Sequence, residues 1–344
     1  MAYSINPKDY FNTVLYTGNE SAGHSITGVG FQPDFIWFKN RGTTDSHAVY
    51  DAVRGVTKEI NPDTGDGETT QSTGLTSFDS DGFTTGARTL LNSNNQPLAS
   101  WHWKMNGAGS SNSDGSVTST VSVNSTAKMS IVKWTGTGSA ATIGHGLGVK
   151  PAFYLHKTTG DNSSGGASQA FNWHVYHHSL GATKALFIHL TNAAATAIGY
   201  WNNTEPTTDV LSLGNLIAGN GQSLVYAWAE VEGYSKFGTY EGNGNADGPF
   251  VSTGFRPRLL MIKNSEQSSN WVVLDSARQT FNPNENYLRW NTGEAEGGTS
   301  TTFDVDFLSN GFKVRSTETD LNTSDKTFIY GAWADVPFKY NNTF

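Results

Sequence analysis

Short apolar runs bounded by Gly, Pro and Asn recur along the whole chain. Phe35-Ile-Trp-Phe38 and Leu259-Leu-Met-Ile262 are near-continuous runs of the length of a buried strand. Asp81-Gly82 and Asn310-Gly311 are each flanked by Phe and predict tight hairpins, because Gly accepts the positive φ that such turns require. No window longer than about a dozen residues keeps a helical period of 3.6 residues. The pattern therefore predicts an all-β protein with little helix.

One set of sequence elements occurs three times. An aromatic-x-Gly element is followed at a constant offset by a Gly-apolar-x-Pro element, then by a third apolar element and a closing element with Trp. The aromatic-x-Gly element occurs as Tyr16-Thr-Gly18, Trp134-Thr-Gly136 and Tyr240-Glu-Gly242, and the Gly-apolar-x-Pro element as Gly30 to Pro33, Gly148 to Pro151 and Gly254 to Pro257. The third element covers His47 to Asp51, Trp173 to His177 and Trp271 to Asp275. The Trp residues of the closing element are Trp103, Trp228 and Trp333. A fixed offset kept by two elements indicates internal duplication.

The copies predict three tandem β-sandwich repeats, jelly-roll or lectin-like, of about 100 residues each. We expect an N-terminal arm over residues 1–12, which could dock on a larger particle. The repeats then cover residues 13–128, 129–233 and 234–344. The Gly/Ser/Asn-rich segment Asn106–Asn124 predicts a linker between the first two repeats, whereas the second junction is tighter. Looser spacing after the third element predicts insertions there.

Composition excludes several classes of function. The chain has 344 residues with 22 Lys+Arg, 30 Asp+Glu and a net charge of −8, which disfavours nucleic-acid binding because phosphate contacts need a basic surface. The absence of Cys excludes disulfides, thiolate metal sites and a cysteine nucleophile. No apolar run approaches the ~18 residues of a membrane span, and the N-terminus does not read as a signal peptide. We expect synthesis in a cytoplasm and no membrane insertion.

The chemistry-bearing residues form no catalytic motif that we recognise, so we expect no enzyme, cofactor or metal. Asp63 to Glu68 holds three carboxylates suited to Ca²⁺, but it lacks the EF-hand spacing and occurs once, which favours a solvated loop. His174, Tyr176 and His178 share one predicted strand face and His177 lies on the other. A metal there is disfavoured because the other copies carry Val and Asp instead of imidazoles.

Aromatic side chains are the remaining resource for binding. Trp103, Trp228 and Trp333 recur in every copy and are therefore expected in the core. Trp201 and Trp290 lie in the predicted insertions without counterparts, which makes them better candidates for a recognition surface than the recurring Trp residues. Because Trp stacks on sugar rings, the candidate glycan-binding surface consists of Trp201, Trp290, Trp173, His174 and His178.

Several phrases of the sequence resemble repeat proteins of marine bacteriophages, including those of cyanobacteria, often described as tail-fibre or virion structural proteins. They are Leu15 to Asn19, Ile26 to Arg41, Tyr50 to Gly55, Thr76 to Phe83, Ser179 to Lys184, Val231 to Gly238 and the ending Pro337-Phe-Lys339. The resemblance implies a non-enzymatic virion surface protein: a tail fibre or receptor-binding component, a head fibre, or a capsid decoration. It implies other virion proteins as partners, a homo-oligomer (a trimer) and adhesion to a host surface.

Two alternatives remain open. A stand-alone carbohydrate-binding, lectin-like module would require Trp201, Trp290 and the strand from His174 to His178 to meet on an exposed rim; burial of all ten Trp would count against it. An enzyme such as a depolymerase would require two facing carboxylates in a deep cleft.

Overall fold

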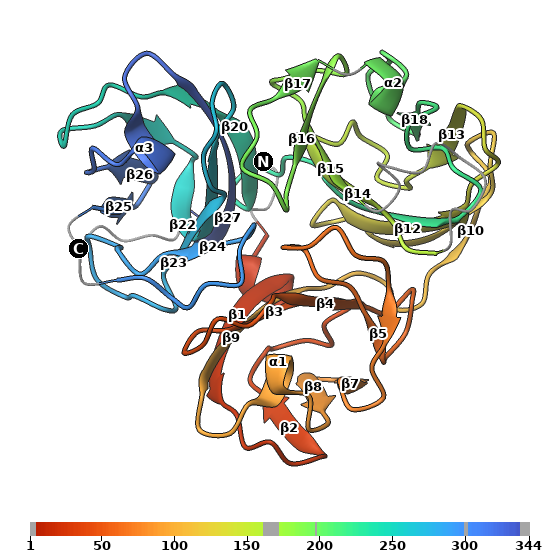
Figure 1. Cartoon of the computed structure of the whole chain (residues 1–344), viewed down its shortest axis with the longest axis horizontal. Helices are drawn as coiled ribbons and strands as arrows, with labels where there is room; N and C mark the ends of the chain where they lie inside the picture. Colours follow the sequence, from red (N-terminus) through yellow and green to blue (C-terminus); the bar gives the residue numbers. More distant parts are fainter. Residues whose placement is uncertain (1–4, 161–171, 197, 299–301, 338–344) are drawn as a thin grey trace.

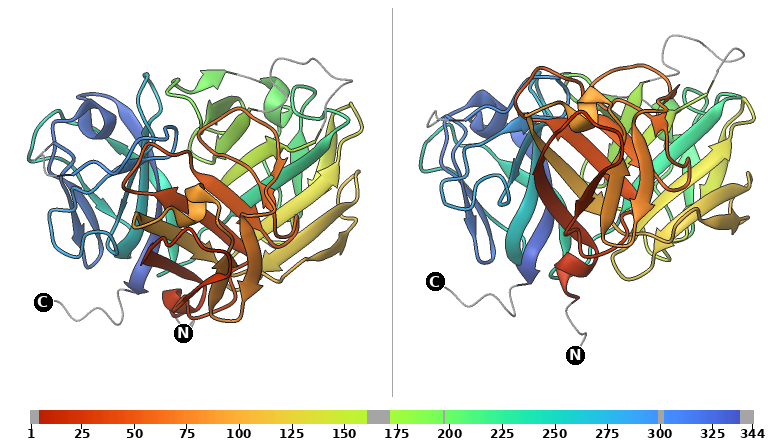
Figure 2. Two further views of the ribbon diagram at one scale, coloured as in Figure 1. Left: turned by 60° about the horizontal axis from the view of Figure 1, so that its bottom comes forward. Right: turned by 90° about the horizontal axis from the view of Figure 1, so that it is seen from below.

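The computed structural model describes residues 5–160, 172–196, 198–298 and 302–337. It shows three β-rich lobes arranged around a common centre (Figure 1). The two further views of Figure 2 show the same grouping. The three α-helices of the described part each span four residues. The prediction of an all-β chain with little helix is confirmed.

Lobe 1 is the first β unit of the chain, preceded by the 3-10 turn η1 (Pro7–Asp9). Its main sheet has the order β1-β9-β3-β4, and a second sheet has the order β2-β8-β7. The main strands are β1 (Phe11–Thr17), β9 (Pro97–Trp103), β3 (Phe35–Asn40) and β4 (Ala48–Asp51). The others are β2 (His24–Thr27), β8 (Gly82–Thr85), β7 (Leu75–Asp79), the pair β5 (Lys58–Glu59) and β6 (Thr69–Thr70), and helix α1 (Thr89–Asn92).

Lobe 2 has a larger main sheet, in the order β10-β11-β12-β19-β14-β15-β16-β17, and a second sheet of β13 and β18. The main strands are β10 (Ser110–Asn112), β11 (Ser119–Asn124), β12 (Met129–Thr135), β19 (Gln222–Trp228), β14 (Phe153–Thr158), β15 (Trp173–His177), β16 (Lys184–Phe187) and β17 (Ala195–Thr196). The remaining elements are β13 (Ala141–Gly144), β18 (Val210–Leu213) and α2 (Ile198–Trp201).

Lobe 3 has a main sheet in the order β20-β27-β22-β23-β24 and a second sheet in the order β21-β26-β25. The main strands are β20 (Ser235–Glu241), β27 (Thr327–Pro337), β22 (Phe255–Asn264), β23 (Val272–Asp275) and β24 (Leu288–Arg289). The others are β21 (Phe250–Ser252), β26 (Gly311–Val314), β25 (Val305–Leu308) and α3 (Thr319–Asn322).

The main sheets share one strand order. In each main sheet four strands lie side by side in the same order: the strand with the aromatic-x-Gly element, the closing strand, the strand with the apolar run that follows the Pro, and the strand of the third element. These are β1-β9-β3-β4, β12-β19-β14-β15 and β20-β27-β22-β23. The registers agree as well, since Phe35, Phe153 and Leu259 face Asp51, His177 and Asp275 in turn. Equivalent sequence elements therefore occupy equivalent positions.

Two layers of core explain why the central strands are apolar at almost every position. In β3, Phe35 and Trp37 enter a core shared by all three lobes, whereas Ile36 and Phe38 enter the core of lobe 1 alone. Residues next to each other in a strand point to opposite faces, so a sheet covered on both faces needs apolar residues in succession. The shared core joins the lobes into one hydrophobic unit.

The centre of the shared core is a triangle of Trp103, Trp228 and Trp333. Their ring centroids lie 6.0 Å apart for Trp103 and Trp228, 5.5 Å for Trp103 and Trp333, and 5.9 Å for Trp228 and Trp333. All three pairs meet edge to face, which is a favoured geometry for aromatic rings. The prediction that the recurring Trp residues are core residues is confirmed.

Each lobe also holds the next one through the segment that follows its third element. We call these insertions 1, 2 and 3 (residues 52–74, 178–209 and 276–304). Insertion 1 offers the Asn61 carbonyl to Trp173 Nε1 of lobe 2 at 3.0 Å, and insertion 2 offers the Phe187 carbonyl to Trp271 Nε1 of lobe 3 at 2.9 Å. Insertion 3 places the Arg289 carbonyl 3.0 Å from His47 Nε2 of lobe 1. The three contacts close a ring.

Two regions differ from the sequence-based expectations. Asn106–Asn124 was expected to be a linker, but it contains β10 and β11, which pair with each other and extend the main sheet of lobe 2 through β12. Polar and Val residues alternate in β11, so this segment has the alternating pattern of a strand although most of its residues are polar. In the expected arm, Phe11 already belongs to β1 and is buried beside Trp103, while residues 1–4 lie outside the described part.

Candidate functional site

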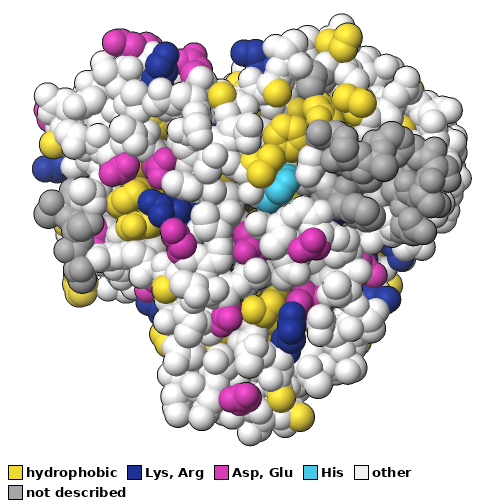
Figure 3. Space-filling model, viewed as in Figure 1, with side chains coloured by type: hydrophobic (Ala, Val, Ile, Leu, Met, Phe, Trp, Pro, Cys, Tyr) yellow, Lys and Arg dark blue, Asp and Glu magenta, His cyan; other side chains and the backbone are white. Residues whose placement is uncertain are grey.

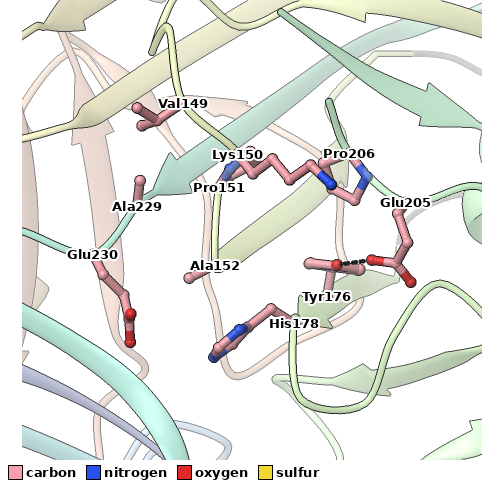
Figure 4. Close-up of a pocket in the computed structure, with 10 residues that line it drawn as sticks. All are labelled: Val149, Lys150, Pro151, Ala152, Tyr176, His178, Glu205, Pro206, Ala229 and Glu230. Carbon is pink, nitrogen blue, oxygen red and sulfur yellow. Dashed lines mark hydrogen bonds between the residues drawn. The ribbon is translucent and has the colours of Figure 1, made fainter. Parts of the chain in front are cut away.

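A pocket of about 240 Å³ lies in lobe 2 where that lobe meets lobe 3. Pro151 and Ala152 lead into β14, Tyr176 and His178 lie at the end of β15, Glu205 belongs to insertion 2, and Glu230 follows β19. Figure 4 shows the two glutamates on opposite sides of the pocket, with His178 between them. Ligand pockets for drug-sized molecules are larger, so this one suits a single small group.

Glu205 is held on one side of the pocket by two donors from its own lobe. The Tyr176 hydroxyl donates to Glu205 Oε2, and the Ala182 amide donates to Oε1 at 2.6 Å. Tyr176 is itself fixed by stacking on Tyr154, with centroids 4.5 Å apart. Burial, together with the neighbouring Glu205 charge, raises the pKa of Tyr176, so its phenol stays protonated and keeps donating. Among the described residues, no cation pairs with Glu205.

The opposite side of the pocket is anchored to lobe 3. The Phe237 amide donates to Glu230 Oε1 at 3.0 Å, and Lys236 Nζ lies 3.3 Å from the same carboxylate. His178 Nε2 lies 3.1 Å from the Phe237 carbonyl, which can only accept, so Nε2 carries the proton and donates. In the neutral ring, Nδ1 is then an acceptor.

The pocket therefore presents mainly hydrogen-bond acceptors. Two carboxylates and one imidazole nitrogen face a small space whose apolar walls include Pro151, Ala152 and Pro206. The Lys150 side chain also lines the pocket and extends toward Pro206 and Glu205 (Figure 4), and Lys236 is the second cation nearby. This arrangement can bind a small group that carries N–H or O–H donors.

Of the predicted glycan-surface residues, only His178 lies in this pocket. Trp173, Trp201, Trp290 and His174 are buried, so the prediction that they form an exposed surface is wrong. Trp201 Nε1 donates to the Lys184 carbonyl at 2.9 Å inside lobe 2. The Trp290 ring stacks on Trp37 of lobe 1 with centroids 4.4 Å apart. Insertion residues without counterparts are thus used to bury neighbouring surfaces.

Strand alternation separates the four residues of the His-rich strand. His177 faces lobe 3, where Nε2 lies 3.3 Å from the Tyr330 carbonyl, as expected for the face opposite His174 and Tyr176. His174 lies inside lobe 2 with Nδ1 3.3 Å from Nδ1 of His156 on the paired strand. His156 was not singled out from the sequence, because only strand pairing brings it to His174.

The acidic loop from Asp63 to Glu68 serves the fold. Asp63 Oδ1 accepts the His47 amide at 3.1 Å, and Glu68 lies 3.3 Å from Arg54 Nη1 and 3.5 Å from Lys58 Nζ. Arg54 and Lys58 neutralise the Glu68 carboxylate. Within the described residues, no group of three or more His, Asp or Glu side chains could hold a metal ion.

Three buried lysines, which were not predicted as functional residues, occur at equivalent strand ends. Lys39 Nζ donates to the Gly293 carbonyl of lobe 3 at 2.9 Å, and Lys263 Nζ donates to the Thr191 carbonyl of lobe 2 at 3.1 Å. Lys157 Nζ lies 5.3 Å from the centre of the Trp173 ring. The signal was present, since each Gly-apolar-x-Pro element is followed by an apolar run that ends in Lys. The contacts of Lys39 and Lys263 join lobes, and all three side chains are buried.

An exposed apolar surface lies on lobe 2. Ile198 and Leu216 are 62% and 51% exposed, and Leu190 is also exposed. Figure 3 shows hydrophobic side chains gathered on this lobe more than elsewhere in that view. This surface belongs to insertion 2 and to the segment after β18.

None of the helices in the described residues is long and apolar enough to cross a membrane. A comparison with curated proteins gives no match. A comparison with protein families matches residues 6–337, which include all three lobes, to one family. The chain therefore belongs to the family described as domain of unknown function (DUF7483).

Proposed function

We propose that this protein is a non-enzymatic surface component of a bacteriophage virion, acting through contacts with other virion proteins and with the host surface. The proposal starts from the sequence resemblance to phage repeat proteins. The structural observation that carries it furthest is the closed ring of lobes, in which Asn61, Phe187 and Arg289 each offer a carbonyl to the next lobe. A surface protein without Cys must keep its shape through packing and hydrogen bonds, and the closed ring of lobes supplies that rigidity.

Buried charge supports a structural role as well. Arg54 with Asp51, and Arg278 with Asp275, form ion pairs whose side chains are almost fully buried. Each pair also bonds to the neighbouring lobe, because Tyr226 donates to Asp51 at 2.7 Å and Trp101 donates to Asp275 at 3.1 Å. These strongly bonded groups fix how the lobes are oriented, and they are not accessible to a substrate.

The lectin alternative loses its main argument. All ten Trp side chains are buried, so none offers an indole face to a sugar ring. The pocket at Glu205 and Glu230 is a binding site of different character, with acceptors in place of an aromatic platform.

The expected homotrimer stays a prediction, and the internal arrangement bears on it. One chain already places three equivalent sheets around an axis through the Trp103, Trp228 and Trp333 triangle. A single copy could therefore fit a threefold position of a particle approximately. Sedimentation of the purified chain would separate the monomer from the trimer.

The experiment that tests the proposal is imaging of the intact virion at subnanometre detail, with the three-lobed outline as the search shape. Few copies at the tail would support a fibre or receptor-binding component. Copies over the head in numbers that follow capsid symmetry would support a decoration or head fibre. Absence from purified particles, checked by mass spectrometry of the same preparation, would overturn the proposal.

A further inference from the structure

We propose that the interface between lobes 2 and 3 opens in mild acid, while the other two interfaces of the ring stay closed. This inference concerns a conformational change of the chain itself, so it goes beyond the virion role and does not depend on it. It rests on the hydrogen bonds of one buried imidazole, His177, and on a comparison of the three interfaces.

The hydrogen bonds of His177 leave room for only one proton on its ring. Nδ1 accepts the Ser179 amide at 3.2 Å, so this nitrogen carries no hydrogen. Nε2 lies 3.3 Å from the Tyr330 carbonyl of lobe 3, which can only accept, so Nε2 carries the proton and donates. The ring is buried. A second proton on Nδ1 would point at the hydrogen of the Ser179 amide, so a charged ring does not fit the closed interface.

The surroundings of His177 do not stabilise a positive charge either. The ring of His178 lies 5.1 Å away between centroids, and its Nε2 donates to the Phe237 carbonyl of lobe 3 at 3.1 Å. Glu230 and Lys236 pair across the same interface, but both side chains are partly exposed, which makes this pair weak. Among the described residues, no carboxylate bonds to either imidazole. Burial, together with the charge that His178 can carry, lowers the pKa of His177 to about 3.

The other two lobes have a carboxylate at the position of His177. The strand registers place Asp51 of lobe 1 and Asp275 of lobe 3 there. Each aspartate is paired with an arginine three residues later, whereas lobe 2 has Leu180 at that position. Burial acts to raise the pKa of Asp275, but the Arg278 charge outweighs it and lowers this pKa below its usual value. The carboxylate of lobe 3 therefore keeps its charge, and its hydrogen bond to lobe 1, in mild acid.

One further neutral imidazole lies between lobes, at the interface of lobes 1 and 3. His47 accepts Trp37 Nε1 at 2.9 Å and lies 3.0 Å from the Arg289 carbonyl of lobe 3. This interface also contains the ion pair of Arg41 with Glu296, whose side chains are mostly buried. The interface of lobes 1 and 3 is thus held by charged contacts in addition to its imidazole, and the interface of lobes 2 and 3 depends on its imidazoles to a greater extent.

Proton uptake links the opening of this interface to pH. Once the interface is open, His177 reaches water and binds a proton near pH 6.5. The closed interface keeps the ring neutral down to about pH 3, so the open state binds one more proton between these values. The ratio of open to closed interfaces should therefore rise about tenfold for each pH unit below 6.5. Trp271 Nε1 and Lys263 Nζ also donate across this interface, and they remain donors in acid.

The test measures distances between lobes in the full chain. Because the chain has no Cys, spin labels can be attached to the exposed positions Thr76→Cys in lobe 1, Thr135→Cys in lobe 2 and Ser252→Cys in lobe 3, two at a time. Double electron–electron resonance then follows all three pairs from pH 7 to about pH 5. We expect a second, longer distance between lobes 2 and 3 that grows as the pH falls, and constant distances for the other two pairs. Simultaneous lengthening of all three pairs, or no change between lobes 2 and 3, would overturn the proposal.

The variant His177→Gln assigns the response to one residue, because its amide can donate to the Tyr330 carbonyl but cannot take up a proton. We expect it to remove the longer distance between lobes 2 and 3 in acid. His102→Gln is the matched control, since His102 is an equally buried imidazole inside lobe 1, 3.1 Å from the Asn12 carbonyl, and it should open like the wild type. Loss of the response in His102→Gln, or its persistence in His177→Gln, would overturn the assignment. The three distances of the otherwise unchanged chain decide the proposal even if a variant does not fold, and virion imaging is independent of all these results.

Discussion

The indole of Trp101 in lobe 1 donates to Oδ2 of Asp275 in lobe 3 across 3.1 Å. The same carboxylate receives Nε of Arg278 at 2.6 Å, and both side chains of this ion pair are fully buried. Tyr226 and Asp51 form the corresponding contact between lobes 2 and 1. At the interface between lobes 3 and 2, Gly331 occupies the position equivalent to Trp101 and Tyr226, and it has no side chain that could donate. Instead, His177 Nε2 lies 3.3 Å from the Tyr330 carbonyl. Two of the three interfaces therefore contain a buried ion pair, and the third contains an imidazole contact.

The variant Asp275→Asn tests the buried ion pair between lobes 1 and 3. It leaves the Arg278 guanidinium buried without its full countercharge, and breaking such a pair costs about 3–5 kcal/mol of unfolding free energy. Asp247→Asn is the matched control, since Asp247 pairs with Lys313 on the surface and should show no measurable change. Urea denaturation of both variants gives the comparison. Equal stability of the two would show that the buried pair does not hold the lobes together.

The variant Trp228→Ala tests the shared core. Trp228 contacts Trp103, Trp333, Phe35 and Phe153, so truncation opens a cavity facing all three lobes. We expect a loss of about 3–5 kcal/mol. The exposed Leu216→Ala should change stability by less than about 0.5 kcal/mol. A loss limited to the signals of lobe 2, with the other lobes unaffected in hydrogen exchange, would contradict a common core.

Acid should destabilise the protein well before its carboxylates are protonated. Burial lowers the pKa values of His102, His156 and His177 to about 3, whereas the unfolded chain protonates its histidines near 6.5. Between these values the unfolded state binds more protons, so stability falls as the pH drops from 6.5 toward 3. Urea midpoints at steps across this window should decrease steadily. His156→Gln should make that decrease shallower, and an unchanged slope would contradict the buried neutral imidazole.

Mild alkali should have the opposite effect. Burial lowers the pKa values of Lys157 and Lys263 to about 7 and that of Lys39 to about 8. Unfolded lysines keep their protons up to about 10.4, so the unfolded state binds more protons between these values. Stability should therefore rise as the pH goes from 7.5 to about 9.5, below the range where tyrosines ionise in the unfolded chain. Lys263→Met should reduce the rise. A flat or falling urea midpoint would show that the buried amines stay charged in the fold.

Most of the local structure could be predicted from the residues themselves. The apolar runs at Phe35 and Leu259 form the central strands β3 and β22. The predicted hairpins form as well, with two-residue turns that end at Asp81 and Asn310, so that Gly82 and Gly311 already pair in the second strand of each hairpin. The recurring Trp103, Trp228 and Trp333 were recognisable as core because a duplicated sequence keeps what its packing needs. These features depend on neighbours in the chain and on strand periodicity, which the sequence displays directly.

The candidate site could not be found in this way. Trp201 and Trp290 have no counterparts in the other copies, and only the folded insertions show that both are buried. Glu205 and Glu230 line the same pocket because of the strand order and an insertion, and no spacing in the sequence predicts this.

Local patterns in the sequence were enough to predict an all-β chain with three related sets of strands and no disulfides. Only the folded chain shows that the three sets close into one ring around a triangle of indoles, that segment 106–124 is part of a sheet, and that lobe 2 has a pocket between Glu205 and Glu230. Strand formation follows from local patterns of apolar residues and turns. Closure of the ring and the pocket depend on side chains of different copies, which meet only when distant surfaces pack together.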